Sequence, residues 1–331
     1  MSELLLSAAA IPSDDARARA KVVRGFQTRD NVFRLLTLAS ALLVLLILGG
    51  VILSLVIGAL PAFEAFGFGF VFNQSWNPVT EKFGAAAPIY GTILTSSIAM
   101  LIAVPVGMGI AVFLTELCPM WLRRPLGIAI ELLAGIPSII YGIWGLFVFA
   151  PFLQQNVQPA LISFFGDVPL LSAVFAGPPY GIGTLTASLI LAIMVLPFIT
   201  SISRDVFETV PNVLKEAAYG MGCTTWEVVR NIVIPFTRVG VIGGVMLGLG
   251  RALGETMAVT FVIGNAHKIS ASVLAPGTTI SATIANEFTE AVGDLYTSSL
   301  VALGLILFVI TFIVLALARL MLMRLDRKAG R

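Results

Sequence analysis

The chain has 331 residues, of which 58% are hydrophobic and 11% are charged, and its formal net charge is +2. This composition excludes a water-soluble globular domain and indicates an integral membrane protein. The nearly balanced charge also excludes a nucleic-acid-binding surface, because the basic residues form no single patch.

Several stretches are apolar enough to cross a hydrocarbon core of about 30 Å as helices of roughly 20 residues. Six are predicted, at about 35–58, 91–114, 125–149, 182–203, 239–264 and 298–318. The first is too long for a cleaved signal peptide and is expected to be retained. The sequence therefore predicts an all-α integral membrane protein whose transmembrane domain covers 35–318.

Lysine and arginine are concentrated in alternate connections of this arrangement. They gather in the tail 1–34, in the turn that holds Arg123 and Arg124, in the loop 204–238 and in the tail 319–331. Because basic connections stay on the cytoplasmic side, both termini are predicted to be cytoplasmic.

The remaining polar groups predict no catalytic residue, metal site or cofactor. Cys118 and Cys223 lie in predicted cytoplasmic loops, where disulfides are rare, and their spacing fits no metal site. The single His267 is expected to be a solvated loop residue at the outer membrane edge. The aromatic run 63–72 is expected to be an interfacial anchor, with a partner surface as the alternative.

The cytoplasmic loop 204–238 is predicted to form two short helices around a corner. Gly222 can adopt the left-handed conformation that ends the first helix. Thr224 and Glu227 form the T-x-x-E pattern of a capping box that opens the second helix. Pro235 is expected to end that second helix.

The same loop carries a spaced pattern of small, acidic and branched residues. Its members are Glu216, Ala217, Ala218, Gly222, Ile232, Ile234 and Pro235. The pattern resembles the EAA loop of bacterial ABC importer permeases, except that Ile234 stands where that family usually has leucine. The resemblance implies a type I importer permease (MetI-like) fold and a coupling helix seated on a cytoplasmic ATPase subunit. The alternative is a helical hairpin that packs only on its own bundle.

The chain lacks the phosphate-binding G-x-x-x-x-G-K-[ST] pattern, since glycine precedes none of its lysines. If transport is driven by ATP, a separate polypeptide must hydrolyse it, and this chain is predicted not to be an enzyme. The glycines at 248–254 superficially resemble a dinucleotide fingerprint, but they lie in a predicted span with no preceding strand.

Two charges fall inside the fifth predicted span. Arg251 is expected near its midpoint, with Glu255 one helical turn later. A charge at the bilayer centre costs about 2.5–3.5 kcal/mol, which marks both residues as functional candidates. At about 100° per residue, both share a face with Gly240, Gly244 and Gly248. Glycines four residues apart allow close helix packing, so this face is predicted to meet another helix or a pathway rather than lipid.

The guanidinium of Arg251 suits a phosphate-like oxyanion, and Glu255 at i+4 could hold it in place. An anion path is therefore predicted. The alternative is a structural ion pair that joins two subunits.

Two further segments, RALGETMA at 251–258 and AGIPSIIYGIWG at 134–145, resemble the permeases of phosphate-specific (Pst) ABC importers of the bacterial cytoplasmic (inner) membrane. Within that family the basic leader and the long outer segment resemble the PstC type. The resemblance implies a PstA-like second permease, two PstB-like ATPase subunits and a PstS-like phosphate-binding protein outside the lipid bilayer. It also implies that Arg251, Glu255 and Thr256 belong to a path for inorganic phosphate.

The expected mechanism is alternating access, in which a separate ATPase moves the loop 204–238. A permease for sulfate or molybdate is one alternative. An ion-coupled secondary transporter or channel, with Arg251 and Glu255 as a relay, is another. A membrane enzyme is the weakest candidate.

Overall fold

The computed structural model describes the backbone of residues 14–166, 168–169 and 171–328, and side chains between 29 and 324 within those ranges. In this part of the chain, helices long and apolar enough to cross a membrane number six. They are Arg29–Phe66, Ala86–Leu117, Ser138–Phe165, Thr184–Glu208, Thr225–Leu253 and Asp294–Arg324. The predicted all-α fold with six spans is confirmed.

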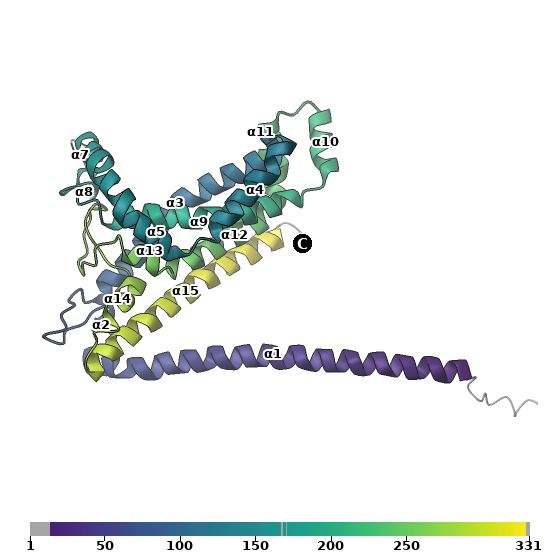
Figure 1. Cartoon of the computed structure of the whole chain (residues 1–331), viewed down its shortest axis with the longest axis horizontal. Coiled ribbons are helices and arrows are strands. Elements are labelled where there is room, and N and C mark those ends of the chain that lie inside the picture. The colour runs from purple at the N-terminus through teal and green to yellow at the C-terminus, as the bar shows by residue number, and fades with distance from the viewer. Residues whose placement is uncertain (1–13, 167, 170, 329–331) are drawn as a thin grey trace, which may run out of the picture. The chain divides into compact units, whose positions relative to one another are not determined.

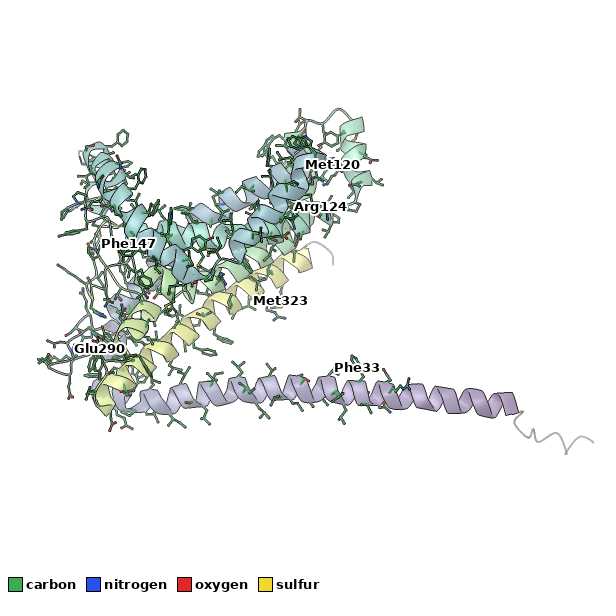
Figure 2. The ribbon with its side chains drawn as sticks, in the orientation of Figure 1. Phe33, Met120, Arg124, Phe147, Glu290 and Met323 are labelled. Atoms are coloured by element: carbon green, nitrogen blue, oxygen red, sulfur yellow. The ribbon has the colours of Figure 1, made fainter. Side chains whose placement is uncertain are left out.

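Helix α1 (Asp14–Phe66) contains the first predicted span, and its part up to Ile57 forms a unit of its own. Its apolar side chains are mostly exposed, as Phe33 is at 66% (Figure 2). An apolar helix of this kind is stable only where lipid or another protein covers it.

The second unit begins at Gly58, and its centre is a bundle of three helices. Helices α3 (Ala86–Val112) and α9 (Thr184–Glu208) pack side by side, and α12 (Ile234–Leu253) packs on both (Figure 1). Val195 and Ile199 of α9 are completely buried where α9 meets α12. Helix α9 is thus the central element of the unit.

The glycine face of α12 packs against α9. A β-carbon at Gly240 would lie 2.6 Å from Val206, and one at Gly244 would lie 2.6 Å from Ile202. Gly248 faces Ile199 in the same way, at 3.0 Å. The prediction that this face meets another helix or a pathway rather than lipid is confirmed for these three glycines, and the missing side chains are what let the two backbones approach.

The prediction of a third span at 125–149 is wrong, because this apolar stretch is divided between two helices. Helix α4 (Met120–Ala134) ends before Pro137, and a new helix begins with α5 (Ser138–Trp144). It continues through η2 (Gly145–Phe149), α6 (Ala150–Phe152), η3 (Leu153–Val157) and α7 (Gln158–Phe165). Proline lacks an amide hydrogen and disfavours a helical residue before it. The hydroxyl of Tyr141 donates to the carbonyl oxygen of Leu133 across the break, at 3.0 Å.

Four further elements of the unit are α2 (Gly69–Phe72), α8 (Leu171–Val174), α14 (Ile280–Glu287) and α15 (Asp294–Lys328). Phe70 and Phe83 are fully buried in an aromatic cluster near the start of α15, whereas Phe68 and Phe72 are 87% and 83% exposed. The run 63–72 therefore contains both packed and exposed aromatic side chains.

His267 is part of this cluster, so the expectation of a solvated loop residue is wrong. Its ring stacks on Trp76, with 5.1 Å between centroids. Its Nε2 atom lies 2.9 Å from Oε1 of Glu287, and both side chains are about 15% exposed. The cause is tertiary, because the loops that follow the first and fifth spans fold onto each other.

Candidate functional site

The loop between α9 and α12 forms the predicted hairpin. Its first helix is α10 (Asn212–Gly220), and Gly222 has a φ of +89° at the corner. The amide of Glu227 donates to the Thr224 hydroxyl at 3.4 Å, and the Thr224 amide donates to the Glu227 carboxylate at 2.8 Å. The left-handed glycine and the capping box are both confirmed.

The prediction that Pro235 ends the second helix is wrong. Helix α11 (Thr225–Val228) runs through η4 (Val229–Val233) into α12 without a break. The residues of η4 form a π-helical turn, whose wider winding accommodates the proline ring and its missing amide. The hairpin therefore continues directly into the fifth span.

Helix α10 exposes most of its surface. Ala218 is buried against a small core that includes Val228 and partly buried Ile232, while Glu216 and Ala217 are exposed. Val213 and Met221 are 73% and 79% exposed. A short helix with exposed apolar side chains is suited to fill a groove on another protein.

One ion pair fastens α10 to the bundle. The Nζ atom of Lys215 lies 2.5 Å from Oε1 of Glu116, and the side chains are only 14% and 6% exposed. Glu116 belongs to η1 (Phe113–Leu117), which extends α3. The sequence analysis missed this pair, since nothing in the pattern relates residues so far apart.

The second group of candidate residues lies where α12 ends. Arg251 is exposed on the last turn, and the helix stops at Leu253. Glu255 and Thr256 follow in irregular backbone that leads into α13 (Met257–Thr260). The expectation that both charges lie on one continuous helix is therefore wrong, because Gly254 ends it.

Glu255 caps the next helix instead of pairing with Arg251. Its Oε1 atom accepts a hydrogen bond from the amide of Ala258 at 3.2 Å. Among the described residues, neither Arg251 nor Glu255 takes part in an ion pair. A carboxylate at a helix N-terminus is favourable, because it accepts from an otherwise unpaired amide.

The two segments 134–145 and 251–258 meet in the folded chain. A β-carbon at Gly142 would lie 2.8 Å from Phe261, 3.0 Å from the carbonyl oxygen of Met257 and 3.2 Å from Cα of Ala258. Only glycine permits this approach of α5 to α13. The Thr260 hydroxyl donates to the carbonyl oxygen of Thr256 at 2.7 Å, within the single turn of α13.

The candidate residues thus form two separate groups. Figure 1 shows α10 and α11 at the end of the unit that also holds the start of α4, whereas α13 and α5 lie nearer its middle. The hairpin joins the two groups directly through the continuous helix from Thr225 to Leu253. The two groups are therefore linked by one uninterrupted helix.

Known proteins are similar to this chain in sequence and in fold. Residues 103–327 match the family described as "Binding-protein-dependent transport system inner membrane component". The phosphate transport system permease protein PstC of Mesorhizobium japonicum is 71% identical over 313 residues, which cover 95% of this chain and 96% of that protein. The protein of the same description from Haemophilus influenzae is 54% identical over 302 residues, covering 91% and 96%.

Two solved structures share the fold at lower identity. A bacterial ABC transporter involved in the import of alginate has a TM-score of 0.56 at 16% identity, covering 81% of this chain and 88% of that one. The MetNI methionine ABC transporter has a TM-score of 0.50 at 16% identity, covering 74% and 95%. This is the type I importer permease fold. The chain therefore belongs to the family of inner membrane components of binding-protein-dependent transport systems.

Proposed function

We propose that this chain is a PstC-type permease subunit that carries inorganic phosphate across the bacterial inner membrane. The observation that carries the proposal is the 71% identity to a phosphate permease over 95% of the chain. The complex would contain a PstA-like second permease, two PstB-like ATPase subunits and a PstS-like phosphate-binding protein. This chain would supply the path and the coupling helix, and the ATPase subunits would hydrolyse ATP.

Arg251 is the residue we assign to phosphate. Its side chain is exposed in the isolated chain, and a guanidinium offers paired N–H groups that match two phosphate oxygens. Glu255 would position the path by capping α13, and Thr256 would add a hydroxyl beside it. Irregular backbone between membrane helices is tolerated where it lines a cavity or is buried in protein, which supports this assignment.

Coupling would begin at α10. Its exposed residues, among them Glu216 and Ala217, would occupy a groove on the ATPase, with Gly222 setting the corner. Ile232 and Pro235 lie on the helix that carries the hairpin's movement to Arg251. Closure of the ATPase dimer would then open the space between the two permeases outward, and reopening would deliver phosphate inward.

Uptake into proteoliposomes tests the assignment of Arg251. We expect the complete complex with the binding protein to accumulate phosphate only when ATP is supplied. Arg251→Ala should abolish uptake without changing the subunit composition. Arg319→Ala, which removes an exposed arginine near the end of α15, should leave both unchanged.

Other outcomes would overturn parts of the proposal. Loss of the second permease from Arg251→Ala would assign Arg251 to a structural contact between subunits. Full transport by this chain alone without nucleotide would assign it to the secondary transporters. Faster uptake of sulfate or molybdate than of phosphate would change the substrate.

A further inference from the structure

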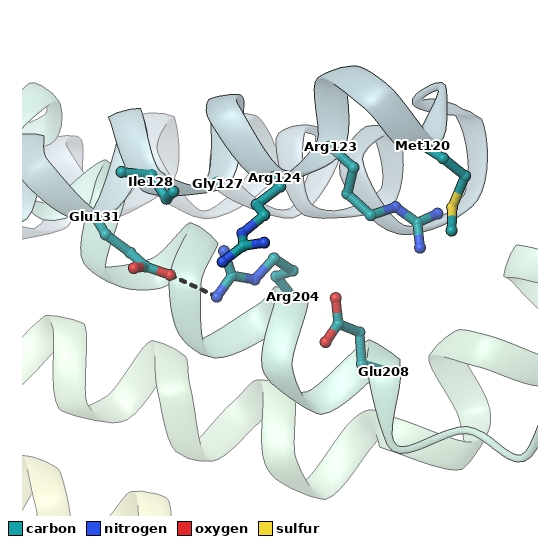
Figure 3. Close-up of a pocket in the computed structure, with 8 residues that line it drawn as sticks. All are labelled: Met120, Arg123, Arg124, Gly127, Ile128, Glu131, Arg204 and Glu208. Atoms are coloured by element: carbon teal, nitrogen blue, oxygen red, sulfur yellow. Dashed lines mark hydrogen bonds and ion pairs between the residues drawn. The ribbon is translucent and has the colours of Figure 1, made fainter.

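A cavity of about 390 Å³ opens between α4 and α9, away from Arg251. Figure 3 shows its charged lining, which consists of Arg123, Arg124, Arg204, Glu131 and Glu208. Figure 2 shows Met120 and Arg124 at the end of the unit that also carries the α10 hairpin. Three guanidiniums in one small cavity are not explained by the transport path.

Arg204 is held in place by two neighbouring carboxylates, those of Glu131 and Asp205. Its Nη2 atom lies 2.7 Å from Glu131 and 2.9 Å from Asp205, and the side chain is 19% exposed. A β-carbon at Gly127 would lie 2.7 Å from Nη1 of Arg204. The glycine therefore lets the guanidinium lie directly on α4, where the carboxylates of Glu131 and Asp205 compensate its charge.

The other two arginines keep donors available. Figure 3 shows the Arg124 guanidinium beside that of Arg204. Within the described residues, Arg124 forms no hydrogen bond or ion pair. Arg123 donates from Nη2 to the carbonyl oxygen of Thr115, while its Nε atom is buried without a partner. An oxyanion bound to Arg124 would compensate the charge that has no carboxylate partner in the described part of the chain.

We propose that this cavity binds a phosphate group. Its chemistry is that of phosphate recognition by a guanidinium fork, which Arg124 presents without a partner among the described residues beside Arg204, with Arg123 also in the lining. Glu208 shares the cavity and weakens the binding of any anion by repulsion. The source would be either the phosphodiester of an anionic lipid headgroup or free inorganic phosphate.

The rim favours the lipid. Met120 and Trp121 are 81% and 77% exposed at the start of α4, and Ile128 is 49% exposed at the cavity. Apolar side chains next to arginines form the usual surface for an acyl chain below a charged headgroup. On the predicted topology this end is cytoplasmic, where the anionic lipids of the inner leaflet lie.

Native mass spectrometry of the complete complex, without binding protein, tests the site. With phosphatidylglycerol added, we expect Arg124→Gln to lower lipid retention about tenfold, because it removes a charged hydrogen-bond donor. Arg319→Gln is the matched control and should retain lipid as the parent complex does. Equal retention by Arg124→Gln and the parent would overturn the proposal.

The variant Glu208→Gln distinguishes an effect on anion binding from an effect on folding. It removes a negative charge from the cavity, so anion binding should become tighter, by about threefold. Misfolding would not produce that gain, and an unchanged or weaker affinity would count against the site.

A parallel titration with inorganic phosphate and no lipid identifies the source. Binding of phosphate that Arg124→Gln weakens and Glu208→Gln strengthens, without lipid retention, would assign the cavity to the free ion. If Arg124→Gln instead releases a protein subunit while both ligands bind normally, the cavity is a protein contact and the proposal is wrong.

Discussion

Lys215 of α10 and Glu116 of η1 form an ion pair with 2.5 Å between Nζ and Oε1. It joins the predicted coupling helix to the extension of α3, and α3 packs along α9 at the centre of the bundle. Since both side chains are largely buried, each charge depends on the other for compensation. Removal of one partner of such a pair costs about 3–5 kcal/mol.

Reversal of one charge of this pair should uncouple ATP hydrolysis from uptake. We expect Lys215→Glu or Glu116→Lys alone to lose most ATP-dependent phosphate uptake in proteoliposomes. The double variant K215E/E116K should recover a substantial part of it, because the opposite charges face each other again. If the double variant recovers the stability of the parent protein but not its phosphate uptake, the ion pair has only a structural role.

The corner of the hairpin should tolerate no side chain at Gly222. Nothing lies within 4 Å of a β-carbon built there, so the effect would arise only from its φ of +89°. A left-handed alanine costs about 1–2 kcal/mol. Gly222→Ala should weaken retention of the ATPase subunits on affinity purification. Gly109→Ala, on α3 and also in open space, is the control that should retain them.

Helix α3 approaches the backbone of Thr278 so closely at Gly91 that the stability of the fold should depend on this glycine. A β-carbon there would lie 1.8 Å from the carbonyl oxygen of Thr278. Gly91→Ala must therefore displace backbone, and we expect a destabilisation of about 3 kcal/mol. Gly109→Ala, on the same helix with nothing within 4 Å, should be neutral. The midpoint of thermal unfolding in detergent measures both, and equal midpoints would contradict the prediction.

The cluster around Glu287 should make the outer end sensitive to acid. Burial raises the pKa of this carboxyl, but hydrogen bonds from His267, Tyr296 and Trp76 outweigh it and lower the pKa below 4.5. Because the folded-state pKa is depressed, the stabilisation is complete above the ordinary value and is lost as pH falls through the depressed one.

The midpoint of thermal unfolding should therefore fall between about pH 5 and pH 3. Glu287→Gln should start from a lower midpoint and show a smaller decline over that range. Glu290→Gln, on an exposed neighbour, should decline as the parent protein does. A decline of full size in Glu287→Gln would show that other carboxyls control acid unfolding.

Several features of this protein could be predicted from the sequence because they depend on local chemistry. Apolar length fixed the number of spans, because a hydrocarbon core admits no other structure of these segments. The capping box at Thr224 and the left-handed Gly222 were predictable, since each depends on residues within a few positions. The packing face of Gly240, Gly244 and Gly248 followed from helical periodicity alone.

Only the tertiary structure decided the partners of the charged groups. The periodic pattern paired Glu255 with Arg251, but Gly254 ends the helix and Glu255 caps α13 instead. Glu116 and Lys215, like His267 and Glu287, meet because distant segments are folded together. An ion pair depends on the distance between two side chains in space, and one chain's local pattern contains no information on contacts between residues far apart.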